Sequence, residues 1–180
     1  MSEAVAREYG YQFQLLDEVH KINEEQRQRF LKKVRQALWT LKDKKLAVLG
    51  LAFKDGTDDV RESPAIQIIR SLIEEGCQIT AFDPAAMEKA KSLLCEKVNY
   101  APDAYTAAQG ADALLILTEW KEFASLDLTR IRELLTYPIV LDGRNLYTSE
   151  EMTRAGLNYY SVGRAPLEIS HPMSAKKIIE

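Results

Sequence analysis

After Lys44 the chain alternates short apolar runs with amphipathic segments, and this alternation constrains the fold more than any other feature of the sequence. The apolar runs have the length of buried strands, and the segments between them have the length of helical crossovers. Because strands joined in this way lie parallel in one sheet, the pattern predicts an α/β fold with a mostly parallel, six-stranded sheet. The predicted strands are residues 46–53, 78–82, 98–100, 113–117, 139–141 and 158–161.

The connections between the strands carry the end signals of helices. Ser63 and Pro64 are typical of a helix start, and Thr148 with Glu151 has the spacing of a capping box. Glycines follow the predicted ends of three helices. The predicted helices are residues 64–75, 84–94 after a capping Asp83, 103–109, 127–135 and a last one ending before Gly156. Strands and helices in this order favour a Rossmann-like, doubly wound sheet.

The segment before the first strand predicts one long amphipathic helix over residues 14–41. Its apolar positions are spaced by three and four, and it contains no proline or glycine. At 1.5 Å per residue it would be about 40 Å long, more than a domain of this size covers. Part of its apolar face is therefore expected to contact another copy or another domain, although it could also lie across its own domain. The predicted organisation is helix 1–43, domain 44–164 and a loose tail 165–180.

A charged segment, residues 50–65, includes the end of the first predicted strand, a turn and the start of the helix that follows. Ligands of open α/β sheets bind at this end of the strands. Lys54 offers a point charge and Arg61 a planar fork, so the two cations would suit a phosphate or carboxylate. The alternative is that both cations pair with Asp58, Asp59 and Glu62 on a solvated loop. Residue chemistry alone leaves both interpretations open.

Further candidates follow other predicted strands. Arg144 comes directly after the strand at 139–141 and would share an edge of the sheet with Lys54; its alternative is an ion pair with Asp142 or Glu150. Asp83 could bind a ribose hydroxyl or only cap the helix that follows it. The tripeptide at 118–120 could line the same edge, or its aromatic residue could belong to the core.

Composition excludes several classes of function. The chain has 24 Lys and Arg against 27 Asp and Glu, and its basic residues form no stripe with aromatic residues, so nucleic acid is not a predicted partner. Two cysteines and two histidines lack the spacing of a metal site or a disulfide framework, so we expect no metal and reduced thiols. No apolar run approaches the roughly 20 residues that cross a bilayer. We expect a soluble, cytoplasmic protein that does not contact the membrane.

Three segments resemble one enzyme family. The charged segment reads GLAFKDGTDDVRESPA and resembles the start of the C-terminal, nucleotide-sugar-binding domain of the UDP-glucose/GDP-mannose dehydrogenases. Residues 141–164 read LDGRNLYTSEEMTRAGLNYYSVGR and resemble the end of that domain. Residues 11–30, YQFQLLDEVHKINEEQRQRF, resemble the end of the helix that joins the two halves of these enzymes. The resemblance covers nearly the whole chain and is strongest to members that oxidise UDP-glucose.

The resemblance implies roles for four residues. Phe53 and Lys54 match the pair that contacts the nucleotide sugar, and Arg144 matches an arginine that helps to hold it. Arg61 matches an arginine that reaches NAD bound to the other half of the enzyme. These are binding roles, and no residue of this chain matches a catalytic one. The long helix matches part of the dimer core, so the resemblance also implies a homodimer.

Two motifs of the complete enzymes do not occur in these residues, a GxGxxG turn and a catalytic cysteine followed by a Phe-Pro-Lys-Asp type run. The implied enzyme oxidises the C6 alcohol of UDP-glucose to a carboxylate with two molecules of NAD, bound mainly by its N-terminal half. This chain would supply the UDP-sugar side and is expected to be inactive alone. The alternatives are a GDP-mannose or UDP-N-acetylmannosamine specificity, and a stand-alone nucleotide-binding or oligomerisation module.

Overall fold

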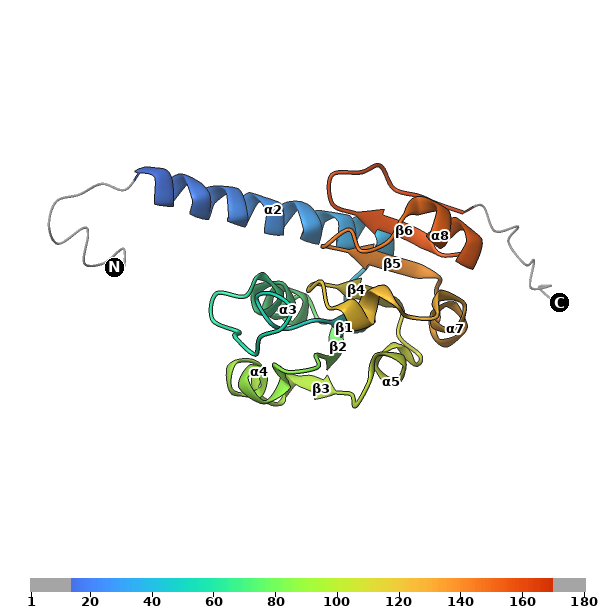
Figure 1. The fold of residues 1–180 in the computed structure, drawn as a ribbon, viewed down its shortest axis with the longest axis horizontal. Helices are drawn as coiled ribbons and strands as arrows, with labels where there is room; N and C mark the ends of the chain where they lie inside the picture. Colours follow the sequence, from blue (N-terminus) through green and yellow to red (C-terminus); the bar gives the residue numbers. More distant parts are fainter. Residues whose placement is uncertain (1–13, 170–180) are drawn as a thin grey trace, which may run out of the picture.

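The computed structural model describes residues 14–169 and consists of a sheet between two layers of helices (Figure 1). Six strands pair in the order β3-β2-β1-β4-β5-β6, and every pair is parallel. Their bounds are β1 (Lys45–Leu49), β2 (Gln78–Phe82), β3 (Val98–Tyr100), β4 (Ala113–Ile116), β5 (Ile139–Asp142) and β6 (Asn158–Ser161). The predicted Rossmann-like, doubly wound sheet is confirmed, and it is wholly parallel.

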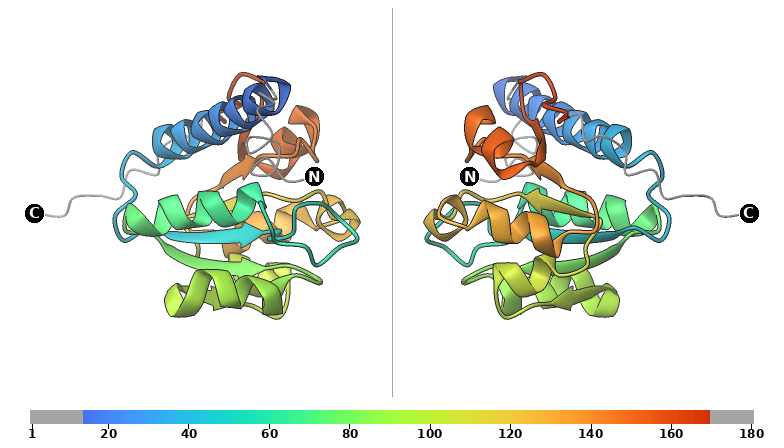
Figure 2. Two further views of the ribbon diagram at one scale, coloured as in Figure 1. Left: turned by 90° about the vertical axis from the view of Figure 1, so that its left-hand side faces the viewer. Right: turned by 90° about the vertical axis from the view of Figure 1, so that its right-hand side faces the viewer.

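Helices cover both faces of the sheet (Figure 2). One face carries α3 (Pro64–Glu74), α4 (Met87–Leu94) and the C-terminal part of α2 (Gln14–Leu38). The other carries α5 (Ala104–Ala108), α7 (Leu128–Leu134) and α8 (Ser149–Ala155). Two short elements are additional to the predicted ones: α6 (Lys121–Ala124) and a 3-10 turn, η1 (Cys95–Lys97).

The core is divided by the sheet into two apolar clusters. In β1, Leu46 and Val48 belong to the cluster under α2 and α3, whereas Ala47 and Leu49 belong to the one under α5. Successive side chains of a strand point to opposite faces, and both faces are covered here. This explains why the strands read as continuous apolar runs rather than as alternating patterns.

The prediction that the first strand continues to Phe53 is wrong. Strand β1 ends at Leu49, because Gly50 has φ of +95° and turns the chain out of the sheet. Leu51 and Ala52 remain buried, but their amides bond to a side chain instead of to a neighbouring strand. The apolar run 46–53 therefore predicts which residues are buried better than it predicts where the strand ends.

Helix ends are set partly by local capping and partly by more distant contacts. The capping box of α8 is confirmed, with the Glu151 amide 3.2 Å from Thr148 Oγ1 and the Thr148 amide 2.8 Å from Glu151 Oε2. Ser63 precedes α3 as predicted but does not cap it with its side chain. Its hydroxyl instead donates to the Leu51 carbonyl oxygen at 2.8 Å. Ser63 thus fastens the charged segment to the end of β1.

Helix α2 is longer than the surface that it covers. Its residues from Phe30 to Leu38 supply buried side chains to the core, whereas residues 18–26 are all exposed. Val19 and Ile22 are 43% and 54% exposed, and this part of the helix extends past the rest of the domain (Figure 1). The expectation that its apolar face exceeds its own domain is confirmed for the described residues. No helix within residues 14–169 is long and apolar enough to cross a membrane.

The start of the predicted loose tail is held against the sheet. Leu167 forms an antiparallel bridge with Tyr159 in β6, and the Ile169 amide donates to Asn158 Oδ1 at 2.7 Å. A loose extension is therefore wrong for residues 165–169. Residues 1–13 and 170–180, which belong to the predicted helical segment and tail, lie outside the described residues.

Gly50 allows a direct test of how β1 ends. A Cβ at this position would lie 2.5 Å from Thr118 Cβ, and the residue has positive φ. We expect Gly50→Ala to lower the free energy of unfolding by about 2–5 kcal/mol, measured by urea denaturation. The control is Gly56→Ala, which has positive φ but open space around it and should cost only about 1 kcal/mol. Equal losses for both variants would contradict the proposed steric role of Thr118.

Candidate functional site

The candidate residues lie in loops at one edge of the sheet. Strands β1, β4 and β5 are neighbours and parallel, so their carboxyl ends meet at the same edge. The loop 50–63 follows β1, residues 117–120 follow β4, and residues 143–148 follow β5. This is the edge where open α/β sheets bind ligands.

Asp83 organises this edge from the end of β2. It is completely buried, and its carboxylate accepts hydrogen bonds on both oxygens. The donors are the amides of Leu51 (2.7 Å), Ala52 (3.1 Å), Ala85 (2.9 Å) and Ala86 (2.7 Å) and the indole Nε1 of Trp120 (3.2 Å). Such a carboxylate, closed off from solvent, has no oxygen to offer to a ribose. The predicted helix over 84–94 begins only at Met87, so Asp83 caps the turn that precedes α4 rather than the helix itself. Its hydrogen bonds also reach the loops after β1 and β4.

The charged loop separates its two cations. Arg61 donates from Nη2 and Nε to Asp59 at 2.8 and 3.0 Å, although its side chain is 87% exposed. The hydrogen bond from Arg61 lowers the pKa of Asp59 to about 2, so Asp59 is ionised at neutral pH. Lys54 is exposed and makes no ion pair within the part of the chain that the structure describes. The pairing alternative thus holds for Arg61 and not for Lys54.

Asp142 shapes the turn that carries Arg144. It is completely buried and accepts the Arg144 amide at 2.8 Å, the Leu146 amide at 2.7 Å and the Tyr159 hydroxyl at 2.7 Å. Burial and the Asp142 carboxylate raise the pKa of Tyr159, so its hydroxyl remains a donor. These bonds fix the backbone from which the Arg144 side chain extends. Tyr159 is a buried packing residue.

The Arg144 side chain pairs with an acid that the sequence did not single out. Its Nε donates to Oε2 of Glu119, at the end of β4, rather than to Asp142 or Glu150. Both side chains are about one-third exposed, at 35% and 33%. The two partners are 25 residues apart, so no local sequence pattern predicts their pairing. The sequence indicates only that residues 118–120 lie at the end of a strand.

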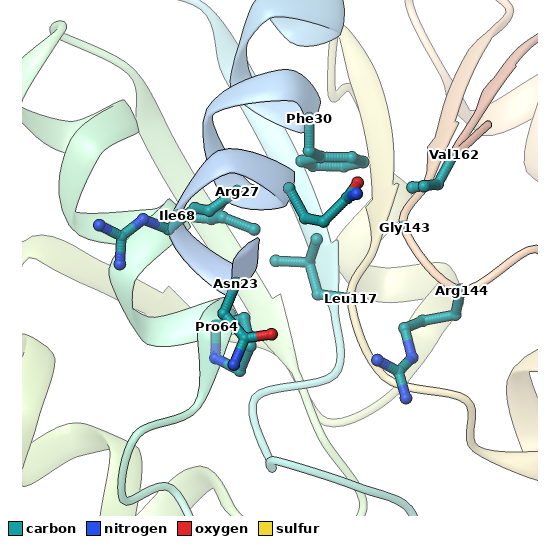
Figure 3. A pocket seen from close by; sticks show the side chains of 11 residues that line it. Asn23, Arg27, Phe30, Pro64, Ile68, Leu117, Gly143, Arg144 and Val162 are labelled. Atoms are coloured by element: carbon teal, nitrogen blue, oxygen red, sulfur yellow. The ribbon is translucent and has the colours of Figure 1, made fainter. Parts of the chain in front are cut away.

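A hollow of about 280 Å³ lies beside Arg144 (Figure 3). Phe30, Leu117 and Val162 give it apolar walls, and Asn23 of α2 faces it. The Arg144 guanidinium lies at the end of the hollow opposite to Phe30 in this view. The hollow therefore combines apolar surface with a cation at its edge.

Phe53 and Arg61 line a second hollow, of about 370 Å³, with Asp59 and Glu62. Phe53 is 52% exposed there. Lys54 lines neither of these two hollows. Lys54 and Arg144 therefore lie at the same edge of the sheet but do not share either hollow. The four sequence-predicted residues thus form a rim rather than a closed pocket.

Within residues 14–169, no group of three or more His, Cys, Asp and Glu side chains is arranged to hold a metal ion. Cys77 is buried and donates to the Leu41 carbonyl oxygen at 3.2 Å. Burial raises the pKa of its thiol to about 12, which makes it a poor nucleophile. Lys54, Arg61 and Arg144 are the cationic hydrogen-bond donors of the rim.

Asp83 should be critical for the order of this rim. We expect Asp83→Asn to lower the free energy of unfolding by about 2–4 kcal/mol, because an amide nitrogen would face N–H donors in a buried site. Urea denaturation measures the loss. Asp58→Asn is the control, since its exposed pair with Lys89 should contribute almost nothing to stability. If Asp83→Asn were as stable as this control, Asp83 would not hold the loops together.

Curated relatives support a functional interpretation of the rim. The chain is 40% identical over 168 residues to UDP-glucose 6-dehydrogenase TuaD of Bacillus subtilis, a match that covers 93% of this chain and 36% of that protein. It is 44% identical over 124 residues to UDP-glucose 6-dehydrogenase of Rhizobium meliloti, covering 69% of this chain and 28% of that protein. The chain thus matches between about a quarter and about a third of the length of these relatives.

A solved structure supports the same interpretation. The UDP-glucose dehydrogenase of Pyrobaculum islandicum superposes with a TM-score of 0.73 at 30% identity, over 90% of this chain and 35% of that one. Residues 47–149 match the family described as "UDP-glucose/GDP-mannose dehydrogenase family, UDP binding domain", and this segment includes the loops after β1, β4 and β5. The chain belongs to the UDP-glucose/GDP-mannose dehydrogenase family and contains its UDP binding domain.

Proposed function

We propose that this chain is the UDP-sugar-binding part of an NAD-dependent UDP-glucose 6-dehydrogenase. The observation that carries the proposal is the position of two cations at one edge of a UDP binding domain. Within residues 14–169, Lys54 has no ion partner and the Arg144 side chain is bonded only through Nε. A diphosphate at this edge would gain charge-assisted hydrogen bonds from both. The similarity to UDP-glucose 6-dehydrogenases at 40% identity or more favours UDP-glucose over the sugars of sibling enzymes.

Three residues would share the binding of the nucleotide sugar. The ammonium of Lys54 approaches phosphate or sugar oxygens, and the terminal nitrogens of Arg144 bind the diphosphate. The half-exposed ring of Phe53 supplies apolar surface beside them. Because Asp83 and Asp142 fix the backbones of these loops, the cations are positioned before the ligand arrives, which reduces the entropic cost of binding.

The role of this chain toward NAD would be limited to Arg61. The 180 residues contain no GxGxxG turn, so we infer that most NAD contacts come from another part of the enzyme. NAD accepts hydride from C6 of the sugar when bound. For Arg61 to reach this cofactor, its guanidinium must exchange Asp59 for a phosphate or carboxylate group.

We further propose that the protein acts as a homodimer in the cytoplasm. The exposed apolar residues Val19 and Ile22 lie on the part of α2 that extends past its own domain, and a second copy would cover them. Such a dimer would place α2 between domains, beside the hollow lined by Asn23 and Arg144.

Calorimetry with UDP tests the binding proposal. We expect the wild-type chain to bind UDP and Lys54→Ala to weaken the Kd by roughly 10- to 100-fold, the scale of a lost hydrogen bond to a charged group. The control is Lys42→Ala, which removes the same charge from the loop before β1, at the other edge of the sheet. If Lys54→Ala binds UDP as well as Lys42→Ala, Lys54 does not contact the ligand.

An assay of NADH formation tests whether this chain alone has dehydrogenase activity. We expect no turnover of UDP-glucose and NAD by this chain alone, because these residues contain no match to the catalytic-cysteine motif. Bacillus subtilis TuaD serves as the positive control under the same conditions. Steady NADH formation by the isolated chain would contradict the prediction.

A further inference from the structure

We propose that Glu119 is a positioning residue for Arg144, which it holds by Nε so that the terminal nitrogens face the diphosphate of the nucleotide sugar. The inference rests on the proposed function, because it assumes that Arg144 binds that anion. It assigns a role to an acid that would otherwise be expected to repel the ligand. This role requires that Glu119 engage Nε of the guanidinium and leave the terminal nitrogens open.

The contact between the two side chains uses only one edge of the guanidinium. Nε of Arg144 donates to Oε2 of Glu119, and no hydrogen bond from Nη1 or Nη2 is formed within residues 14–169. An arginine fork that is free at its terminal nitrogens can bind two oxygens of a phosphate side by side. Glu119 therefore leaves the ligand-binding part of Arg144 open.

Glu119 is itself held in place by its neighbours in the chain. Thr118 is buried, and its hydroxyl donates to the Ala52 carbonyl oxygen at 2.7 Å. Trp120 donates from its indole nitrogen to Asp83 at 3.2 Å. The carboxylate of Glu119 thus extends from a backbone that is fastened on both sides.

The end of β4 consequently connects three loops through three successive side chains. Thr118 reaches the loop after β1, Trp120 reaches the residue after β2, and Glu119 reaches Arg144 after β5. Since Asp142 fixes the Arg144 amide, both partners of the Glu119–Arg144 pair begin from fixed positions. Holding a long side chain in one conformation before binding removes part of the entropic cost of binding.

Glu119 could position Arg144 or could repel the anionic ligand, and its negative charge allows the two roles to be distinguished. If Glu119 merely occupied the place of the ligand, or only repelled it, any removal of the carboxylate would strengthen UDP binding. If Glu119 positions Arg144, the loss of its side chain must weaken binding despite the loss of repulsion. A glutamine keeps an oxygen that can accept from Nε and removes the charge.

The experiment is a calorimetric titration of UDP into the wild-type chain, Glu119→Ala, Glu119→Gln and the control Glu122→Ala. Glu122 is an exposed acid three residues further on, so its variant changes the net charge equally without touching Arg144. We expect Glu119→Ala to weaken the Kd about three- to tenfold, and Glu119→Gln to bind at least as tightly as wild type. Glu122→Ala should bind like wild type. A Glu119→Ala variant that binds equally or more tightly would overturn the proposal, as would a Glu119→Gln variant that is as weak as alanine.

Two further measurements separate this inference from the proposed function. Arg144→Ala should weaken UDP binding, and if it does not, the proposed function of Arg144 fails whatever Glu119 does. The Nε–H signal of Arg144 in an NMR spectrum of the ligand-free chain reports positioning directly. We expect a resolved signal, slow to exchange with solvent, in wild type and Glu119→Gln, and its loss in Glu119→Ala. The same signal in all three proteins would contradict the positioning role without any use of UDP.

Discussion

The buried carboxylate of Asp83 is the interaction on which the rest of this edge depends. Its donors come from the loop after β1, from the turn before α4 and from Trp120 after β4, so one side chain orders three separate segments. A carboxylate can be buried only where hydrogen bonds replace its contacts with water. The loops meet this requirement with main-chain amides, and the loop of Lys54 and Arg61 is consequently built on a fixed base.

The acids of this edge have two distinct physical roles. Asp83 and Asp142 are buried and organise backbone amides, whereas Asp59 and Glu119 are partly exposed and pair with the cations Arg61 and Arg144. Lys54 alone of the three candidate cations has no ion partner within residues 14–169. An arriving anion would therefore meet a free ammonium and a half-engaged guanidinium, although the chain carries a net charge of −3. Recognition of an anion at this edge would therefore be local and would not depend on the charge of the whole domain.

The fold was predictable because burial on both faces makes each strand a continuous apolar run, and the helices between them have local caps. Apart from the positive φ of Gly50, which ends β1 early, the failures come from contacts between residues far apart in the sequence. Leu51 was assigned to a strand because it is apolar, but its amide bonds to Asp83, 32 residues away. Ser63 was expected to cap a helix and bonds instead to Leu51. The Glu119–Arg144 pair could not be read from the sequence for the same reason, whereas Arg144 itself was indicated by its position after a strand.

We propose that the loops after β1 and β5 together form one binding surface for the diphosphate of a nucleotide sugar. The most direct measurement is a titration of UDP into the 15N-labelled chain, followed by amide chemical shifts in NMR spectra. The largest shifts should occur together in residues 53–61 and 143–146, with the same apparent Kd in both segments. Shifts confined to one of the two loops, or centred on the opposite edge near Lys42 and Gly76, would contradict the claim.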